Sequence, residues 1–372
     1  MRYYIIAGEA SGDLHGSNLV KQLKNCDDQA VIRAWGGGLM EQAGAEIVKH
    51  YRDLAFMGFS EVLMNLKTIL NNLSYCKKSI ESFKPDAIIL IDYPGFNLRI
   101  AKWAHNEQYK VLYYISPQIW AWKQSRVKQI KAYVDEMFVI LPFEKEFYEK
   151  FGVDVHYVGH PLIDALEDYK QNTLSHTEFK ERNQLGDKPI IAILPGSRKQ
   201  EISAMLPIML KAVNEVGDFE LVIAGAPSQE EAFYKSILKE TKVKVLFNST
   251  YEILTHAHAA LVTSGTATLE TAIFKIPQVV CYKGGLVSYI IARALVKVKY
   301  ISLVNLIMDK MVVKELIQNE MNVQSVQKEL NKITGNQEYR DRMLADYDKL
   351  YSKLGGGGAS KLAAREMFKT LQ

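Results

Sequence analysis

Short apolar runs rich in β-branched residues alternate with longer stretches of helical periodicity along this chain, and the series occurs twice. The first series consists of the runs Tyr3 to Ala7, Val31 to Trp35, Ala87 to Ile91, Val111 to Ile115 and Met137 to Leu141. Strands that are buried on both faces carry continuous apolar runs, because neither face meets water. The alternation therefore predicts βαβ units and a parallel sheet covered by helices, which is a Rossmann-like α/β domain.

The second series follows a polar stretch from Gly159 to Lys188, which we interpret as a linker. Its apolar runs are Ile190 to Leu194, Phe219 to Ala224, Val243 to Leu246, Ala259 to Thr263 and Gln278 to Tyr282. A chain of 372 residues, of which 48% are hydrophobic, is large enough for two cores. We therefore expect an N-terminal Rossmann-like domain over residues 1–165 and a second one over residues 166–345.

Residues 346–372 are expected to form a C-terminal hinge and helix. Gly355 to Gly358 interrupt the helical pattern of this region, and four consecutive glycines are costly to hold in a helix. The last helix is therefore expected to turn back onto the N-terminal domain or to reach a partner subunit, and a homodimer is the assembly that we expect.

Composition excludes several classes of protein. The 46 Lys and Arg residues exceed the 42 Asp and Glu residues by only 4, which is too small an excess for a nucleic-acid-binding protein. The three cysteines, Cys26, Cys76 and Cys281, lie far apart, so we expect a reducing cytoplasm and neither a disulfide framework nor a zinc site. The N-terminus does not read as a signal peptide, and no apolar run reaches the roughly 18 residues that a spanning helix needs. Any membrane contact is therefore expected to be peripheral.

Two segments of the first half carry candidate functional groups where a predicted strand ends. Gly8 to Asp13, with the sequence GEASGD, opens a helix, so its backbone N–H groups can meet a ligand. An ordinary glycine turn would have the same composition. Asp92 follows the strand Ala87 to Ile91, at the edge where open α/β sheets bind ligands. Its carboxylate can act as a general base or as the N-cap of the next helix, and the sequence leaves both roles open.

Two segments of the second half occupy equivalent places. Leu194 to Arg198 (LPGSR) ends a strand before a helix, where a guanidinium and a helix N-terminus together suit a phosphate; a surface arginine is the alternative. Thr263 to Glu270 (TSGTATLE) offers hydroxyl groups, a glycine and a carboxylate at another strand-to-helix junction. Such a turn can bind a diphosphate and a ribose, or it can simply cap the helix.

Two other clusters favour ordinary structural roles. We expect no metal at His256 and His258, because alternate residues of a helix point apart and no third ligand lies nearby in the sequence. Trp120 and Trp122 precede several basic residues, a combination that also occurs in nucleic-acid-binding surfaces. We interpret them instead as an aromatic anchor beside a solvated helix face, and we expect no nucleic-acid partner.

Taken together, these and other segments resemble the bacterial lipid A disaccharide synthase family. The matching segments follow one order along nearly the whole chain: GEASGDLHG at Gly8, MGFSEVL at Met57, IDYPGFN at Ile91, SPQIWAWKQSRV at Ser116, LPFEKEFY at Leu141, GHPLID at Gly159, LPGSRKQEI at Leu194, TSGTATLE at Thr263, and YISLVNLI and VVKELIQ toward the C-terminus. A set of this length is specific.

The resemblance implies a metal-independent, inverting glycosyltransferase of the GT-B fold, in which two Rossmann-like domains have parallel sheets that face a central cleft. It implies transfer of 2,3-diacylglucosamine from its UDP donor to the 6-hydroxyl of 2,3-diacylglucosamine 1-phosphate. The products would be a β(1→6) disaccharide 1-phosphate and UDP, as a step of lipid A and lipopolysaccharide biosynthesis in Gram-negative bacteria. No cofactor is expected.

The resemblance also implies roles for individual residues. Asp92 matches the base on the acceptor hydroxyl, and Arg198 matches an essential arginine near the donor diphosphate. Further donor-binding positions are Ser197, Ser264, Gly265, Thr266, Glu270 and Asn305, and the acceptor side of the cleft has Glu9, Ser11 and Gly12. Gly95 stands where the family usually has a second acid, which leaves Asp92 without a competing carboxylate. Val304 replaces a usual proline, which leaves the backbone before Asn305 less constrained.

A lipid substrate agrees with two apolar segments, 56–70 and 286–299. The residues expected to meet a membrane or acyl chains are Phe56, Met57, Phe59, Val62, Leu63, Leu66, Arg293 and Lys297. A basic amphipathic segment can attract anionic head groups and bury its apolar face, whereas a core helix with solvated edges would give a similar pattern. We expect peripheral association with the cytoplasmic face of the inner membrane.

Two other functions remain open from the sequence. A UDP-N-acetylglucosamine 2-epimerase is built on the same double-Rossmann plan, and fold alone does not separate the two enzymes. A non-catalytic protein that binds a nucleotide sugar or a lipid is the other alternative. The epimerase would need no lipid acceptor, and the binding protein would tolerate loss of Asp92.

Overall fold

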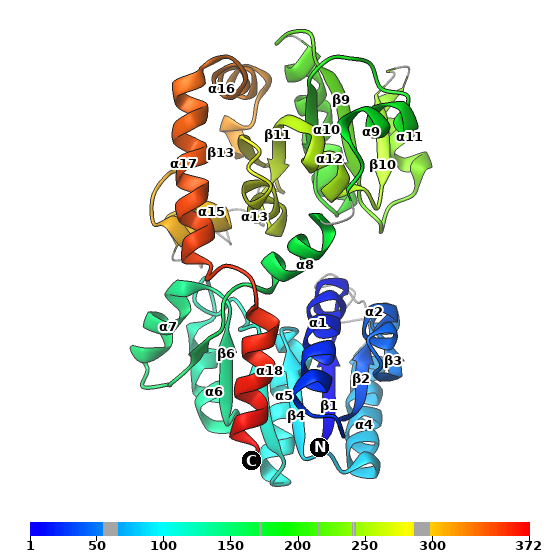
Figure 1. The fold of residues 1–372 in the computed structure, drawn as a ribbon, viewed down its shortest axis with the longest axis vertical. Coiled ribbons are helices and arrows are strands. Elements are labelled where there is room, and N and C mark those ends of the chain that lie inside the picture. Colours follow the sequence, from blue (N-terminus) through cyan, green and yellow to red (C-terminus); the bar gives the residue numbers. More distant parts are fainter. Residues whose placement is uncertain (55–65, 171–172, 215, 240, 242, 286–297) are drawn as a thin grey trace. The chain divides into compact units, whose positions relative to one another are not determined.

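The computed structural model describes residues 1–54, 66–170, 173–214, 216–239, 241, 243–285 and 298–372. This part of the chain divides into two compact units. The first unit consists of Met1–Glu167 together with Leu354–Gln372, and the second consists of Asp168–Lys353. Each unit contains one parallel sheet with helices packed against it (Figure 1).

The sheet of the first unit has the strand order β3-β2-β1-β4-β5-β6-β7. Its strands are β1 (Arg2–Ala7), β2 (Val31–Gly36), β3 (Glu46–His50), β4 (Ala87–Ile91), β5 (Lys110–Tyr114), β6 (Glu136–Val139) and β7 (His156–Tyr157). Its helices are α1 (Ala10–Cys26), α2 (Gly38–Gln42), α4 (Leu66–Phe83), α5 (Pro94–Asn106), α6 (Val127–Tyr133), α7 (Pro142–Glu149) and α18 (Ala359–Thr370), with short 3-10 turns η1 (Tyr51–Leu54) and η2 (Gln124–Arg126). Helix α8 (Pro161–Lys170) carries the chain into the second unit.

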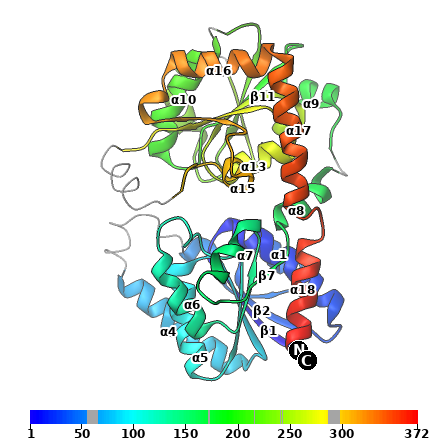
Figure 2. The same ribbon diagram turned by 90° about the vertical axis from the view of Figure 1, so that its left-hand side faces the viewer.

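Helices cover both faces of this sheet, as its continuous apolar strands predict. Helices α1 and α18 lie side by side on one face, and α4, α5 and α6 lie on the other (Figure 2). Successive residues of a strand point to opposite faces. Tyr4 and Tyr113 accordingly join the core beneath α4 and α5, and β4 is buried along its whole length.

The sheet of the second unit has the order β10-β9-β8-β11-β12-β13. Its strands are β8 (Ile190–Leu194), β9 (Glu220–Gly225), β10 (Lys244–Phe247), β11 (Ala257–Thr263), β12 (Gln278–Tyr282) and β13 (Lys314–Ile317). Its helices are α9 (His176–Asn183), α10 (Lys199–Asn214), α11 (Glu231–Leu238), α12 (Thr250–His256), α13 (Thr266–Ile273), α15 (Leu303–Met308), α16 (Val323–Gly335) and α17 (Gln337–Lys353), with the 3-10 turn η3 (Gln318–Glu320).

The predicted linker is wrong in one respect, because most of the stretch from Gly159 to Lys188 is folded. It contains helices α8 and α9. Phe179 of α9 is fully buried and belongs to the core of the second unit. The polar composition of α9 reflects its exposed faces, which surround this single anchoring ring.

The C-terminal helix α18 belongs to the first unit and packs against α1. Helix α17 runs without interruption to Lys353, so the chain leaves the second unit after Lys353 and not after residue 345. Gly355, Gly356 and Gly358 have φ angles of 88°, 68° and 93°, which only glycine adopts readily, and they break the helical path.

Asp164 of α8 holds the beginning of α18. Its carboxylate accepts hydrogen bonds from the backbone N–H groups of Gly358 at 2.6 Å, Ala359 at 3.2 Å and Ser360 at 2.8 Å. These donors have no partner within the helix, so a carboxylate at this position satisfies them and complements the helix dipole.

We predict that Asp164→Ala will loosen α18 locally, because its first-turn N–H groups lose their acceptor. A lost cap costs about 1–2 kcal/mol, so amide hydrogen exchange within α18 should accelerate roughly 5- to 30-fold. Asp154→Ala removes an exposed carboxylate of the same unit and serves as the control. Equal exchange in the two variants would contradict the role of Asp164.

Candidate active site

Each sheet has one point at which the strand order reverses, and ligands of open α/β sheets bind at the carboxyl ends of the strands there. In the first unit this point lies between β1 and β4, which pair in parallel from Tyr3 with Ala87 to Ala7 with Ile91. The segments that follow these two strands are Gly8 to Gly12 and Asp92 to Gly95. The structure therefore brings Asp92 to the same edge as Glu9 and Ser11.

Asp92 begins the turn after β4 in an unusual backbone conformation. Asp92 and Tyr93 have φ angles of 42° and 48°, and Ile115, which follows the neighbouring strand β5, has a φ of 63°. Left-handed backbone is uncommon outside glycine and is a clear outlier for a β-branched residue. Residues in such conformations cost free energy and cluster at functional sites. The edge formed by the ends of β4 and β5 thus has the strain that is typical of an active site.

Two side chains hold this strained turn in place through the backbone carbonyl of Asp92. The Asn97 amide donates to this oxygen at 2.8 Å, and the Tyr113 hydroxyl donates to it at 2.5 Å. Asn97 is fully buried in the first turns of α5, and Tyr113 is fully buried in β5. The backbone of Asp92 is thus fixed from two elements, and neither of these two contacts uses its carboxylate.

Burial and, to a smaller extent, the negative charge of Glu9 raise the pKa of the Asp92 carboxyl to about 7, and a hydrogen bond from the Tyr93 amide limits the rise. A carboxylate with this pKa is a stronger base than an ordinary aspartate and is still substantially ionised at neutral pH. Perturbed carboxylates of this kind are typical of general bases.

The GEASGD segment divides into exposed and structural residues. Glu9 and Ser11 are exposed at the start of α1, and the Glu9 side chain caps no helix N–H group. Gly8 has no room for a side chain, because a Cβ there would collide with the Tyr93 ring. Asp13 is buried and accepts from the N–H groups of Gly37, Leu39 and Met40, so it caps α2.

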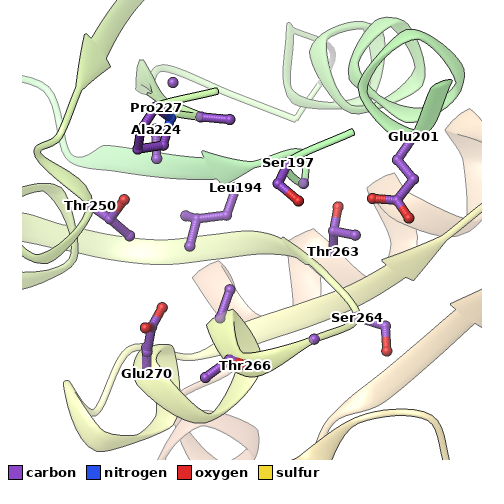
Figure 3. A pocket seen from close by; sticks show the side chains of 15 residues that line it. Leu194, Ser197, Glu201, Ala224, Pro227, Thr250, Thr263, Ser264, Thr266 and Glu270 are labelled. Carbon is purple, nitrogen blue, oxygen red and sulfur yellow. The ribbon is translucent and has the colours of Figure 1, made fainter. Parts of the chain in front are cut away.

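The order of the second sheet reverses between β8 and β11, and a pocket of about 310 Å³ lies at the carboxyl ends of these strands and of β9. Its lining comprises Leu194, Gly196, Ser197, Glu201, Ala224, Gly225, Ala226, Pro227, Thr250, Thr263, Ser264, Gly265, Thr266, Ala267 and Glu270 (Figure 3). The predicted residues Ser197, Ser264, Gly265, Thr266 and Glu270 all line it. The volume lies at the lower end of the usual range for ligand pockets.

Glycines allow the backbone to form the two turns of this pocket. Gly196 has a φ of 105°. Gly265, the N-cap of α13, has φ 155° and ψ −163°, a region that is essentially restricted to glycine, although there is open space around the position of a Cβ. Both turns lead into helices, α10 and α13, whose first N–H groups face the strand ends. The pocket therefore suits an anionic group.

Two carboxylates occupy opposite ends of the pocket. Figure 3 shows Glu270 directed toward Leu194 and Thr250, whereas Glu201 is directed toward Thr263. Burial raises the pKa of Glu270, and the Tyr251 hydroxyl, which donates to it at 3.2 Å, opposes the rise. Glu270 is thus placed to accept hydrogen bonds from ligand hydroxyl groups.

Arg198 lies immediately before α10 and extends into solvent. Its side chain is 71% exposed and is 3.4 Å from Glu201, in a contact of a kind that contributes little to stability. Arg198 does not line the pocket, although its neighbour Ser197 does. The guanidinium is therefore held only weakly and can turn toward a phosphate.

Asn305, a predicted donor contact, does not line this pocket, because its side chain is fully buried and all its hydrogen-bonding groups have partners. Its amide nitrogen donates to Val313 O and to Glu315, and its amide oxygen accepts from the N–H groups of Val312 and Val313. The backbone before it is also constrained, despite the absence of the proline, since Ser302 caps α15.

Asn305 instead belongs to a polar network that supports the pocket. Glu315, which the sequence did not single out, accepts from the N–H groups of Ile301 and Ser302 and from the Ser302 hydroxyl. The Ser264 hydroxyl in turn donates to Ile301 O at 2.8 Å. The YISLVNLI and VVKELIQ segments thus form one scaffold beneath the 264–266 turn.

The two histidines that we considered as a metal pair lie in different elements. His256 ends α12 and His258 belongs to β11, so the helical premise of the sequence argument is wrong. His256 stacks on Phe179, and His258 contacts Arg340. Within the described ranges, no group of three His, Cys, Asp or Glu side chains is arranged to hold a metal ion.

Most of the expected membrane or acyl-chain residues lie outside the described part of the chain: Phe56, Met57, Phe59, Val62, Leu63, Arg293 and Lys297. The backbone of Leu66 begins α4, and its side chain is not described. Among the residues that the structure does describe, no helix has the length and apolar character to cross a bilayer.

Solved structures with the same fold include two classes of enzyme. The UDP-GlcNAc 2-epimerase of Neisseria meningitidis bound to UDP-GlcNAc has a TM-score of 0.71 at 14% identity, with 99% of this chain and 100% of the epimerase covered. The calicheamicin glycosyltransferase CalG4 has a TM-score of 0.59 at 16% identity, with 100% and 98% covered. At this identity the likeness shows the fold, which is that of GT-B glycosyltransferases and 2-epimerases.

Sequence comparison separates these classes. A family model described as lipid-A-disaccharide synthetase matches residues 3–364. A lipid-A-disaccharide synthase of Syntrophus aciditrophicus is 39% identical over 369 residues, which cover 97% of this chain and 95% of the relative. One of Coxiella burnetii is 36% identical over 366 residues, which cover 97% and 96%. The chain therefore belongs to the lipid-A-disaccharide synthase family of glycosyltransferases.

Proposed function

We propose that this glycosyltransferase moves 2,3-diacylglucosamine from its UDP donor to the 6-hydroxyl of 2,3-diacylglucosamine 1-phosphate. The products are the β(1→6) disaccharide 1-phosphate and UDP. The observation that carries the proposal is the Asp92 carboxylate, whose pKa is raised to about 7 at the reversal point of the first sheet. Membership of the family supports the lipid substrates.

The proposed reaction is a single displacement. Asp92 accepts the proton of the acceptor hydroxyl while the oxygen of this hydroxyl forms a bond to the anomeric carbon. The bond from this carbon to the UDP oxygen breaks, and its electron pair leaves with UDP. Attack from the face opposite the leaving group inverts the anomeric carbon, and Asp92 ends the step protonated. General-base help of this kind contributes about 10²- to 10⁴-fold to a rate.

The pocket of the second unit is the proposed donor site. The first N–H groups of α10 and α13 would bind the diphosphate, and Glu270 would accept hydrogen bonds from ribose hydroxyls. Arg198 would bind phosphoryl oxygens through its guanidinium and stabilise the charge that develops on UDP as it leaves. Its weak contact with Glu201 leaves it available for this role.

We also propose peripheral contact with the cytoplasmic face of the inner membrane, because the acyl chains of both substrates enter from a bilayer. Leu70 is 63% exposed and Tyr75 is 49% exposed on α4, whose first residues belong to the apolar segment 56–70. A large apolar side chain in solvent is stabilised by contact with a lipid surface.

A homodimer stays a prediction from the sequence.

The central prediction concerns UDP release from UDP-2,3-diacylglucosamine in the presence of EDTA. The parent chain should release UDP only when 2,3-diacylglucosamine 1-phosphate is present, and Asp92→Asn should lower kcat by about 10²- to 10⁴-fold. Asparagine tolerates the left-handed backbone at this position, so the variant should retain the parental Tm. No UDP release by the parent chain would favour the epimerase or the binding protein. Release without acceptor, or full turnover of a folded Asp92→Asn variant, would contradict the proposed mechanism.

The pH dependence should report the raised pKa of Asp92. A general base works only when it is deprotonated, so kcat/KM should fall as the pH decreases through about 7. Glu9→Gln removes a negative charge that raises the pKa of Asp92, and it should shift this decrease to lower pH. Glu107→Gln changes an exposed carboxylate at the other end of α5 and should leave the profile unchanged. A profile insensitive to Glu9 and centred near pH 4 would contradict the assignment.

Loss of the Arg198 guanidinium should weaken stabilisation of the departing UDP. We expect Arg198→Ala to lower kcat by about 10²- to 10³-fold, the range for removal of one group that stabilises transition-state charge. Arg198→Lys should recover only part of the rate, because an ammonium cannot bind two oxygens in parallel. The control is Lys199→Ala, which removes the adjacent exposed cation. An Arg198→Ala variant no slower than this control would refute the role.

A further inference from the structure

The loop that follows β5 emerges beside Asp92. Strands β4 and β5 are neighbours in parallel register, with Ile91 opposite Tyr114, so the segments after them leave the sheet at one edge. The loop runs from residue 115 to the start of α6 and contains the 3-10 turn η2. The proposed mechanism uses Asp92 but assigns nothing to this loop.

Buried contacts fix the loop on the body of the first unit. Trp120 is 7% exposed, donates from its indole N–H to Glu144 at 3.2 Å, and packs edge-on against Phe143 at 4.9 Å between ring centroids. Glu144 is itself buried and also accepts the N–H groups of Ile140 and Leu141. Trp120 is therefore the anchor, and the residues after it have a defined position.

Two cations gather around the exposed ring that comes next. Trp122 is 48% exposed. Lys123 Nζ lies 4.5 Å from the centroid of its ring, and Arg126 Cζ lies 5.8 Å from it. Neither cation has a carboxylate within 4 Å among the described residues. Cation–π contacts orient these groups without neutralising them, so the loop presents a fixed positive charge.

Arg126 also lies within electrostatic range of the group that holds Asp92. The pKa of the Tyr113 phenol is raised well above its ordinary value by burial and by the charges of Asp92 and Tyr148, and the positive charge of Arg126 opposes this rise. The Tyr113 hydroxyl donates to Asp92 O at 2.5 Å. Tyr113 thus contacts Asp92 through a hydrogen bond and also lies close enough to the half-buried guanidinium of Arg126 to feel its charge.

We propose that Arg126, assisted by Lys123 and positioned by Trp122, binds the phosphomonoester of the acceptor substrate. This inference rests on the proposed function, which supplies an acceptor with a phosphate at one end and a reacting hydroxyl at the other. A phosphomonoester carries about −1.5 to −2 charges at pH 7, and a planar guanidinium matches two of its oxygens. With the phosphate held at the loop, the hydroxyl can reach Asp92 on the same edge.

The test compares two acceptors, 2,3-diacylglucosamine 1-phosphate and the same sugar without its phosphate, in parent and variant enzymes. The parent should prefer the phosphorylated acceptor. Arg126→Ala should raise the KM of the phosphorylated acceptor about 10- to 100-fold, the range of charge-assisted hydrogen bonds, and should abolish the preference. The KM of the donor and kcat at saturation should stay unchanged. Arg126→Lys keeps the charge and should recover part of the preference.

Lys128→Ala, which removes an exposed cation from the next turn, is the matched control and should behave as the parent does. A parent that transfers sugar, together with an Arg126→Ala variant that keeps the preference, would overturn the inference and leave the proposed function intact. A parent that transfers no sugar would instead refute the function.

Membrane phosphates have the same chemistry, and sedimentation with vesicles of anionic or neutral phospholipid distinguishes the two sources. If Arg126→Ala loses binding to anionic vesicles but keeps the acceptor preference, the loop binds lipid head groups, and the proposed subsite is wrong. Unchanged vesicle binding with a lost preference supports the subsite.

Discussion

Parallel pairing of β1 with β4, and of β8 with β11, decides where the candidate functional groups of this protein come together. In each sheet the strand order reverses at that pair, so the two segments that follow these strands diverge and leave a crevice between them. Asp92 and Glu9 meet because Ile91 lies opposite Ala7. Ser197 and Gly265 line one pocket because Leu194 lies opposite Val262. A shift of either register would separate these groups.

The strained backbone at the ends of β4 and β5 is stabilised by its surroundings. An aspartate in the left-handed region with a pKa near 7 is unfavourable on both grounds. Its neighbours compensate: Asn97 and Tyr113 hold its carbonyl oxygen, and the surrounding core is closely packed. The same turn therefore positions the proposed base and prevents its backbone from relaxing to an ordinary conformation.

The second unit uses a different arrangement, because no acid in the described pocket turns after β8 and β11 has a left-handed backbone. Glycines provide the unusual backbone at Gly196 and Gly265, and a buried network centred on Asn305 and Glu315 supports the 264–266 turn through Ile301. The backbone of these turns thus shapes the pocket, and the buried network stabilises one of the turns. This suits a site that binds a donor through N–H groups and a few carboxylates.

Much of this arrangement could be predicted from the sequence, because strands buried on both faces leave continuous apolar runs and parallel strands bring their ends to one edge. Three strands were missed because they lack a continuous apolar run. β3 (EIVKH), β7 (HY) and β13 (KELI) are short or partly polar edge strands. The positions of Asp92, Ser197 and Glu270 followed from the strand ends. The roles of Asn305 and Tyr113 did not, because their contacts depend on tertiary packing.

A single displacement with Asp92 as the base allows only one stereochemical outcome, so the configuration of the product tests the account most directly. NMR coupling at the anomeric carbon of the new linkage, compared with that of the donor sugar, gives this configuration. The proposed displacement predicts inversion and a β linkage. Retention of the donor configuration would require two successive displacements or attack from the face of the leaving group, and it would contradict the role that we assign to Asp92.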